Sequence, residues 1–346
     1  MVTRYVNTAS TAGGNGTTND IVGANRAFAT LSEAESALRT LNAADDLEIL
    51  CCGAVADSGG NITFWNGHNY ITNGHTIYVN ANRSDVAGFH GGKWNTSTYI
   101  RNGSINITTQ DRWHFVLNGI QMLRNGVNGG LLEFGGGTGT KTITITNCLF
   151  NNTLNSEYER NVIMISYVAT GTVNFINSVF NSQNLVGNCL YIKSGGIVNI
   201  YNCGFTGARH EAVLRASGTV VIKNSFSFNN VDDFYGTATI DHCASDDGDG
   251  TNPIAVANWA DQFHNPNYAA EFDFSLTGTS VLLDAGIGPD SDANVPTTDI
   301  LAYDRSGLTA TVGAFEHEWD WSPVVPSTSN EIQFFGQLHG QLHGQE

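Results

Sequence analysis

The range 246–252 is the most acidic short stretch of the chain, with the sequence DDGDGTN. Its carboxylates are closely spaced and alternate with glycines, so their oxygens can wrap a hard cation such as calcium. The stretch lacks the glutamate at the twelfth loop position that completes an EF-hand. We therefore expect either a calcium site on Asp246, Asp247 and Asp249 or a solvated acidic turn, and no other cofactor.

Two short carboxylate-bearing sequences precede this stretch, Asp232-Asp233 and Asp241-His242. Two carboxylates about 5–10 Å apart, on either side of a glycosidic bond, can perform glycoside hydrolysis. On a strongly acidic chain, neighbouring carboxylates also arise without any such role. The sequence does not place these side chains relative to one another, so we assign no catalytic residue.

The tripeptide Arg209-His210-Glu211 offers a further polar cluster. It could bind an acidic sugar through its arginine, or it could form a salt bridge within a loop. The chain has no nucleophile-elbow motif and no glycine-rich phosphate loop that opens a helix. These patterns favour a protein without enzymatic activity, although they leave an enzyme open.

Four large aromatic residues lie near the end of the chain: Trp319, Trp321, Phe334 and Phe335. Residues 317–346 show little alternating pattern that would bury these side chains within the chain itself. A soluble monomer seldom leaves such a group exposed. We therefore predict an extended C-terminal arm whose aromatic residues bind another chain.

Composition excludes several classes of protein. The 346 residues carry 15 Lys+Arg against 32 Asp+Glu, a net charge of -17, which disfavours binding to nucleic acid or anionic membranes. Hydrophobic residues at 41% and aromatic residues at 10% exclude disorder. The chain has no apolar run of membrane-spanning length and its start lacks the pattern of a secretory signal peptide. We expect the six cysteines to be thiols.

Five segments repeat a short alternating strand, then Asn or Asp-His, then Cys or Ser, usually followed by an aromatic residue. They cover residues 142–150, 172–180, 197–205, 219–226 and 237–243. Alternation sends one set of side chains into a shared core. That set comprises Ile143, Ile145, Val173, Phe175, Val198, Ile200, Val220 and Ile222.

Asparagine recurs after these strands at positions 118, 147, 177, 202 and 224, at intervals of 22 to 30 residues. Asparagine tolerates the left-handed backbone of a tight corner, and intervals of this length correspond to one turn of a solenoid. The sequence therefore predicts an all-β fold, a right-handed parallel β-helix. The small residues Cys148, Ser178, Cys203, Ser225 and Cys243 would form one inward column at a corner.

An exposed solenoid end needs a cover. The sequence Thr30-Leu31-Ser32-Glu33 is a capping box, and apolar residues recur at helical spacing as far as Leu41. This pattern predicts a short helix that covers the first coil. We divide the chain into an N-terminal cap at 1–50, a β-helix with a closing region at 51–316 and the arm at 317–346.

Short motifs at both ends of the chain are typical of one group of proteins. The start contains RYVN at 4–7, GGNGT at 13–17 and RAFATL at 26–31. The end contains FDFSL at 272–276, SVLLDAG at 280–286, Asp299-Ile300, Asp304-Arg305 and VGAFE at 312–316. In these motifs the chain resembles, over about residues 4–316, pectate-lyase-like right-handed β-helix proteins of the bacteriophage-virion and bacterial-surface type.

This resemblance implies the fold but not one function, because the superfold hosts lyases, hydrolases, adhesins, tailspikes and inert virion parts. Its pectate lyases place calcium-binding carboxylates and a basic residue on one strand face, and its hydrolases place aspartates on neighbouring coils. No such set stands out here, since most outward strand positions hold Thr, Asn or Ser.

The preferred hypothesis is a structural phage virion protein, a capsid decoration docked through its arm. We expect a homotrimer, made in the host cytoplasm and located in the virion, with other virion proteins as partners and no nucleic acid or membrane. The alternatives are a polysaccharide lyase or glycoside hydrolase near Asp232, Asp233, Asp241 and Arg209, and a tailspike-like protein that binds surface glycans. An open groove with two carboxylates and aromatic platforms would favour the enzyme.

Overall fold

The computed structural model describes residues 1–41, 45–65, 69, 74–81, 88–108, 113–124, 130–135, 141–153, 161–166, 171–183, 187–193, 196–236, 238–266 and 272–316. The predicted arm, with Trp319, Trp321, Phe334 and Phe335, lies outside these residues. Within them, no helix is long and apolar enough to cross a membrane.

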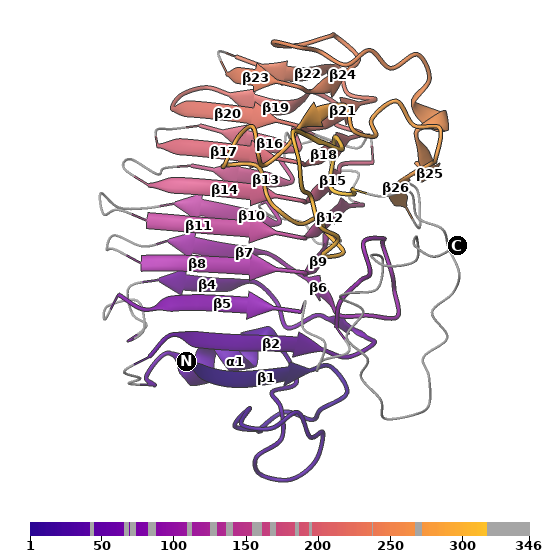
Figure 1. The fold of residues 1–346 in the computed structure, drawn as a ribbon. Helices are drawn as coiled ribbons and strands as arrows, with labels where there is room; N and C mark the ends of the chain where they lie inside the picture. Colours follow the sequence, from indigo (N-terminus) through magenta and orange to yellow (C-terminus); the bar gives the residue numbers. More distant parts are fainter. Residues whose placement is uncertain are drawn as a thin grey trace, which may run out of the picture.

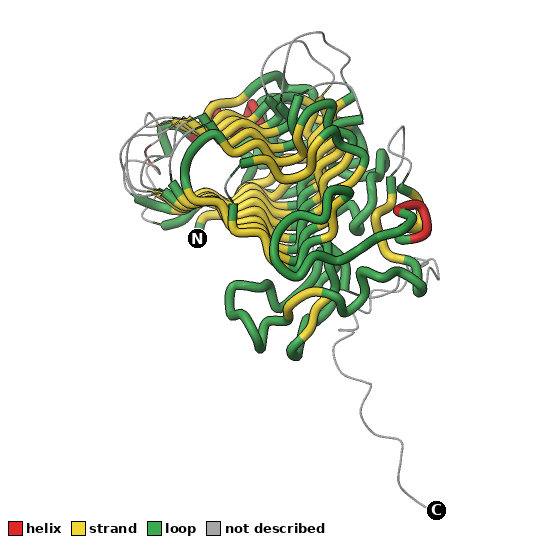
Figure 2. The backbone as a smooth tube through the Cα atoms, turned by 90° about the horizontal axis from the view of Figure 1, so that it is seen from above, coloured by secondary structure: helices red, strands yellow, loops and turns green. Residues whose placement is uncertain are grey.

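Three long parallel sheets run the length of the molecule and together form a right-handed parallel β-helix (Figure 1). We call these sheets A, B and C. From β2 to β22, each coil contributes one strand to each sheet in the order A, B, C; β1 adds to sheet A alone, and β23 and β24 add to sheets A and B. Figure 2 looks along the solenoid and shows the strands of successive coils stacked on one another. The predicted fold class is therefore confirmed.

The strand bounds follow this order. Sheet A holds β1 (Val2–Asn7), β2 (Leu47–Cys52), β5 (Thr76–Asn80), β8 (Trp113–Asn118), β11 (Lys141–Thr146), β14 (Thr172–Ile176), β17 (Ile197–Tyr201), β20 (Thr219–Lys223) and β23 (Thr239–Asp241). Sheet B holds β3 (Ala56–Asp57), β6 (Ile100–Asn102), β9 (Gln121–Arg124), β12 (Leu149–Asn152), β15 (Val179–Asn181), β18 (Gly204–Thr206), β21 (Phe226–Phe228) and β24 (Ala244–Ser245). Sheet C holds β4 (Ile62–Trp65), β7 (Ile105–Thr108), β10 (Leu132–Gly135), β13 (Ile163–Ile165), β16 (Leu190–Ile192), β19 (Glu211–Arg215) and β22 (Asp232–Tyr235).

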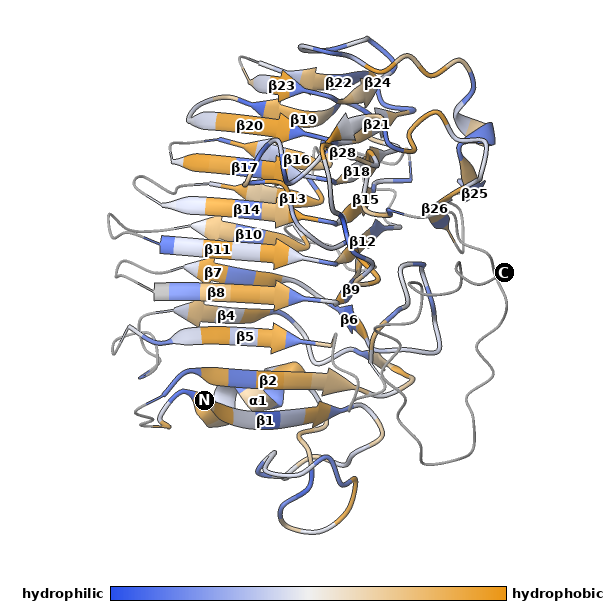
Figure 3. Cartoon of the chain, viewed as in Figure 1, coloured by the Kyte–Doolittle hydropathy of each residue, from blue (hydrophilic) through white to orange (hydrophobic). Residues whose placement is uncertain are grey.

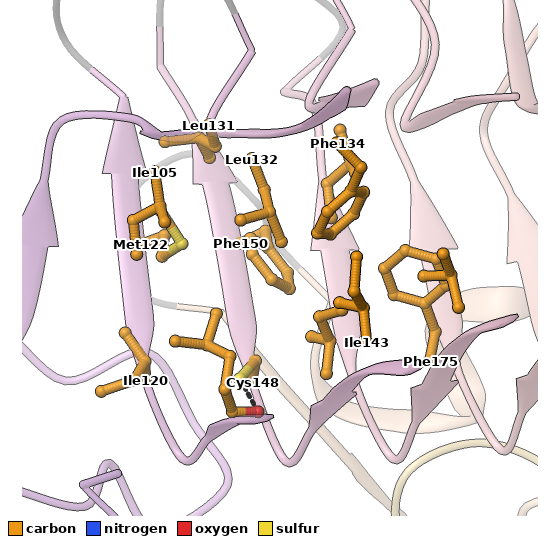
Figure 4. Close-up of a cluster of buried hydrophobic side chains, with 14 of the residues drawn as sticks. Ile105, Ile120, Met122, Leu131, Leu132, Phe134, Ile143, Cys148, Phe150 and Phe175 are labelled. Carbon is orange, nitrogen blue, oxygen red and sulfur yellow. Dashed lines mark hydrogen bonds between the residues drawn. The ribbon is translucent and has the colours of Figure 1, made fainter. Parts of the chain in front are cut away.

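The core is a stack of inward side chains, and sheet A shows it most clearly. Ile145, Phe175, Ile200 and Ile222 are successive register partners, and all four are fully buried. Hydropathy alternates along these strands in Figure 3. Figure 4 shows Phe175 beside Phe134 of sheet C, within an interior that all three sheets line. The predicted register is confirmed.

The corners that follow β8, β11, β14, β17 and β20 each hold a residue with left-handed backbone. Asn147, Asn177, Asn202 and Asn224 adopt φ angles of 54°, 47°, 53° and 49°. The fifth predicted position, Asn118, is wrong by one residue: Asn118 ends β8 as the partner of Thr146, and Gly119, with φ of 70°, takes the corner. Glycine adopts this conformation without strain.

The small residues at the next position form the predicted inward column: Cys148, Ser178, Cys203, Ser225 and Cys243 all have no exposed surface. The Ser178 hydroxyl accepts a hydrogen bond from the backbone N–H of Cys148 at 3.1 Å. Burial raises the pKa of the Cys148 thiol to about 12. The described cysteines are all free, buried thiols, so this column is part of the core.

The helix α1 (Leu31–Leu38) lies beside β1 and β2 at the N-terminal end of the stack (Figure 1). The Thr30 hydroxyl accepts a hydrogen bond from the Glu33 N–H at 3.1 Å, and the Glu33 carboxylate accepts one from the Ala29 N–H at 2.8 Å. Leu31, Ala34 and Leu38 are buried against the first coils. The predicted capping helix is confirmed.

A second chain segment covers the outer face of sheet B. It follows the 3₁₀ helix η1 (Trp259–Asp261) and contains β25 (Phe263–Asn265), β26 (Asp273–Leu276), β27 (Gly286–Ile287) and β28 (Thr309–Ala310). We call its residues 272–316, which include β26, β27 and β28, the closing segment. Its apolar residues, among them Phe274 and Val312, form one cluster with outward residues of sheet B such as Val179 and Phe226.

The corner asparagines also hold the closing segment. Their side-chain amides donate to backbone carbonyl groups: Asn177 to Thr298, Asn202 to Thr311 and Asn224 to Ile287, at 2.8, 3.0 and 2.7 Å. The outer face of sheet B is therefore unavailable to a ligand along this stretch, which leaves the faces of sheets A and C.

The core ladder yields a first prediction. Phe175→Ala should lower the free energy of unfolding by about 3–5 kcal/mol, because it leaves a cavity between register partners. Thr172→Ala, at an outward position of the same strand, should change stability by less than about 0.5 kcal/mol. Chemical denaturation measures both, and equal effects of the two variants would contradict the register.

Candidate functional site

The outward face of sheet C carries a column of large side chains. Met164, Tyr191, Leu214 and Tyr235 are successive register partners on β13, β16, β19 and β22. Each is at least partly exposed, whereas the residues before them, such as Leu190, are buried. We call these four residues the apolar column. Such a row of aromatic and aliphatic side chains offers flat contact surface to a ligand.

A polar column runs beside the apolar column, three residues earlier on each coil. It consists of Asn161, Asn188, Glu211 and Asp232. The Asn188 side-chain amide donates to Asn161 Oδ1 at 2.9 Å, and the Glu211 backbone N–H donates to Asn188 Oδ1 at 3.0 Å. Asp232 is the register partner of Glu211 on the next coil. Hydrogen bonds to neighbouring coils thus fix the two amides.

The first three residues of each column border a groove of about 400 Å³. Its lining residues come from three consecutive coils: Asn161, Met164, Gly187, Asn188, Tyr191, His210, Glu211 and Leu214. The groove therefore combines apolar contact surface with a few convergent polar groups, as ligand sites commonly do.

The groove is electronegative at the Glu211 end. Burial raises the pKa of Asp232, and the nearby negative charges of Asp247 and Glu211 raise it further. The Arg215 guanidinium donates to the carbonyl oxygen of Gly218, and so it is tied to its own turn. Arg209 is exposed and is absent from the described lining, so the predicted polar cluster contributes only His210 and Glu211 to the groove.

Of the three residues predicted to bind calcium, two lie in one acidic cluster and the third does not. Asp247 and Asp249 lie with Asp233, and one carboxylate oxygen from each falls within 4.8 Å of the others. The Asp246 carboxylate is engaged elsewhere, accepting hydrogen bonds from the Trp259 indole N–H at 2.5 Å and the Asn229 N–H at 2.9 Å.

Asp233 is the most buried member of this cluster, with 1% of its surface exposed. Its carboxylate accepts hydrogen bonds from the Ser227 hydroxyl at 2.5 Å and the Asp246 N–H at 2.6 Å. Burial outweighs these bonds and raises the pKa of Asp233 to about 6. Within the described residues, Asp249 Oδ2 is buried and accepts no hydrogen bond.

The predicted carboxylate pairs do not converge on one cleft. Asp241 ends β23 in sheet A, where its carboxylate lies 2.8 Å from His242 Nδ1. Asp232 begins β22 in sheet C, and Asp233 points into the acidic cluster. Sequence reasoning missed Asn188, Tyr191 and the rest of the apolar column, because sheet C lacks the Asn-Cys repeat that marks sheet A.

No protein-family model matches the chain, and no curated protein matches it either. Among solved structures, the chain is similar to the crystal structure of pectate lyase Pel9A. That match has a TM-score of 0.36 and 14% sequence identity, and it covers 91% of this chain and 96% of the other. The activity of that protein is not carried over to this chain.

The raised pKa of Asp233 predicts a pH dependence of stability. A carboxyl group whose pKa is higher in the folded state binds its proton more tightly there, so its protonation stabilises the fold. Stability from this group should rise as pH falls through about 6 towards 3.8.

Asp233→Asn should remove this part of the pH dependence, of the order of 2–3 kcal/mol over the full window. Unfolding measured at several pH values, with the exposed Asp290→Asn as control, tests the slope. Identical slopes for wild type and Asp233→Asn would contradict the assignment.

Calcium binding remains a prediction. We expect millimolar calcium to raise the melting temperature at neutral pH, and the gain to shrink near pH 5, where a proton competes for Asp233. Asp247→Asn combined with Asp249→Asn should abolish the gain, while Asp246→Asn should retain most of it. A gain that magnesium reproduces, or that the double variant keeps, would count against a site.

Proposed function

We propose that the protein is a glycan-binding β-helix, and that an extended sugar chain lies in the groove of sheet C. The observation that carries the proposal is the pairing of the apolar column with the polar column along three coils. Sugars have an apolar ring face and a polar edge of hydroxyl groups. Tyr191 suits the ring face, and Asn161, Asn188 and Glu211 suit the hydroxyl groups.

The geometry of the solenoid supports a chain rather than a single sugar. Parallel strands recur every ~4.8 Å, which is close to the length of one residue in an extended polysaccharide. Met164, Tyr191 and Leu214 would each meet a successive part of such a chain. Because the residues are strand positions held by backbone pairing, the surface is preorganised and little ordering is needed on binding.

Binding without cleavage fits the groove better than catalysis does. Glycoside hydrolysis uses two carboxyl groups that flank the scissile bond. Among the described lining residues Glu211 supplies the one carboxylate. Its neighbour Asp232 lies on the same side of the apolar column, as its register partner, so the two do not face one another across the groove.

The virion hypothesis stays a prediction. A capsid decoration or a tailspike-like protein, trimeric and attached through residues 317–346, would use a stiff β-helix with a glycan-binding face. The docking residues lie outside the described part of the chain, and none of the described contacts bears on them.

Tyr191→Ala should weaken glycan binding at least about tenfold, because it removes the central aromatic contact of the groove. A glycan array identifies the ligand, and isothermal titration compares the variants. Tyr303→Ala, an exposed tyrosine on the closing segment, is the matched control and should bind as wild type does.

Two results would contradict the proposal: an array on which the folded protein binds no glycan, or a Tyr191→Ala variant that binds as tightly as wild type. Reducing ends or unsaturated products released from a bound glycan would instead establish an enzyme.

A further inference from the structure

We infer that the groove of sheet C selects glycans that carry protonated amino groups over uronates and neutral sugars. This inference rests on the proposed function and names the class of ligand. It follows from where the charges lie around the groove, and Glu211 is the specificity-determining residue.

Glu211 presents an unpaired negative charge to the groove. Its backbone N–H is bound to Asn188, but its carboxylate makes no hydrogen bond or ion pair within the described residues. The side chain is partly exposed and lines the groove. A carboxylate in this setting gains most from a cationic hydrogen-bond donor, because such charge-assisted bonds are about twice as strong as neutral ones.

The neighbouring coil strengthens this negative field. Asp232 follows Glu211 in the polar column, one strand further along the solenoid. The pKa of Asp232 is raised in part by Glu211 and Asp247, which means that these carboxylates repel one another. A cation beside Glu211 would relieve that repulsion, whereas a uronate carboxylate would add to it.

Neither arginine beside the groove cancels this charge, and His210 is the one basic residue in the described lining. Arg215 is bound to the Gly218 carbonyl oxygen, and Arg209 is not among the described lining residues. Lys193 is exposed, just after β16, and is not among the described lining residues. The groove thus has its negative edge along the polar column, where a sugar substituent would meet Glu211.

The charge of the whole chain acts in the same direction. A net charge of -17 repels polyanions and attracts polycations at long range. Polyuronates would approach this protein against that field, while polymers of amino sugars would approach with it. The long-range field and Glu211 therefore favour the same class of glycan.

The test compares three probes of similar length: a deacetylated β-1,4-linked glucosamine hexasaccharide, its fully N-acetylated form and a hexagalacturonate. Titrations are made in mildly acidic buffer, where the glucosamine amines are protonated, and are repeated at high salt. The first two probes share one backbone and differ only at the amino group, which is charged in one probe and acetylated in the other. Comparing both probes on wild type and on Glu211→Gln separates the effect of the charge from that of the acetyl group.

We expect the deacetylated hexasaccharide to bind at least about tenfold more tightly than its acetylated form. Hexagalacturonate should bind more weakly than either glucosamine probe. Glu211→Gln should bring the two glucosamine probes to within about threefold while it retains the Tyr191-dependent contact. Asp290→Asn, which removes one exposed charge remote from the groove, should leave the preference intact.

The outcomes separate this inference from the proposed function. If the acetylated or the galacturonate probe binds as tightly or more tightly, and Tyr191→Ala abolishes that binding, the inference is overturned and the glycan groove stands. If the deacetylated probe binds but neither Glu211→Gln nor Tyr191→Ala weakens it, attraction is non-specific and the inference is overturned. If none of the probes binds, the inference is overturned, and the glycan array decides the proposed function.

Discussion

The two-residue period of the strands is the constraint on which the rest of the molecule depends. Because side chains alternate between the two faces of a parallel strand, one fixed register decides both the core and the outer surface. Phe175 lies inward as the partner of Ile145 and Ile200. The same pairing in sheet C sends Tyr191 outward between Met164 and Leu214.

The closing segment decides which outer surface is left for a ligand. It buries the outer face of sheet B under Phe274 and Val312. Its backbone carbonyl groups accept hydrogen bonds from the side-chain amides of Asn177, Asn202 and Asn224. The buried Arg305 adds an ion pair to Glu316 at 2.8 Å and a hydrogen bond to Asn177 at 2.6 Å. Among the described residues, no comparable segment covers the face of sheet C, which holds the groove.

Much of the fold could be predicted from the sequence, because sheet A repeats a strongly alternating strand with Asn and a small residue after it. The inward ladder and the small-residue column follow directly from that pattern, and the capping box at Thr30 marks the helix. The corner predicted at Asn118 was wrong because Gly119 adopts the left-handed conformation there, as asparagine does at the later corners.

The groove could not be predicted in the same way. Its strands β13 and β16 are three residues long, too short for a period-two pattern to stand out from chance. Met164, Tyr191 and Leu214 belong to different coils, and loops of unequal length separate them in the sequence, so only strand pairing brings them into one column. The place of Asp233 beside Asp247 and Asp249 could not be predicted either. Asp233 belongs to the preceding coil, and only strand pairing brings it next to them.

A crystal structure of the full chain with a bound glucosamine oligosaccharide is the sharpest test of glycan binding on sheet C. We expect sugar rings along sheet C, with one ring stacked on Tyr191 and an amino group within hydrogen-bond distance of the Glu211 carboxylate. An oligosaccharide bound instead to the face of sheet A or to the closing segment, with the groove of sheet C free, would contradict this expectation.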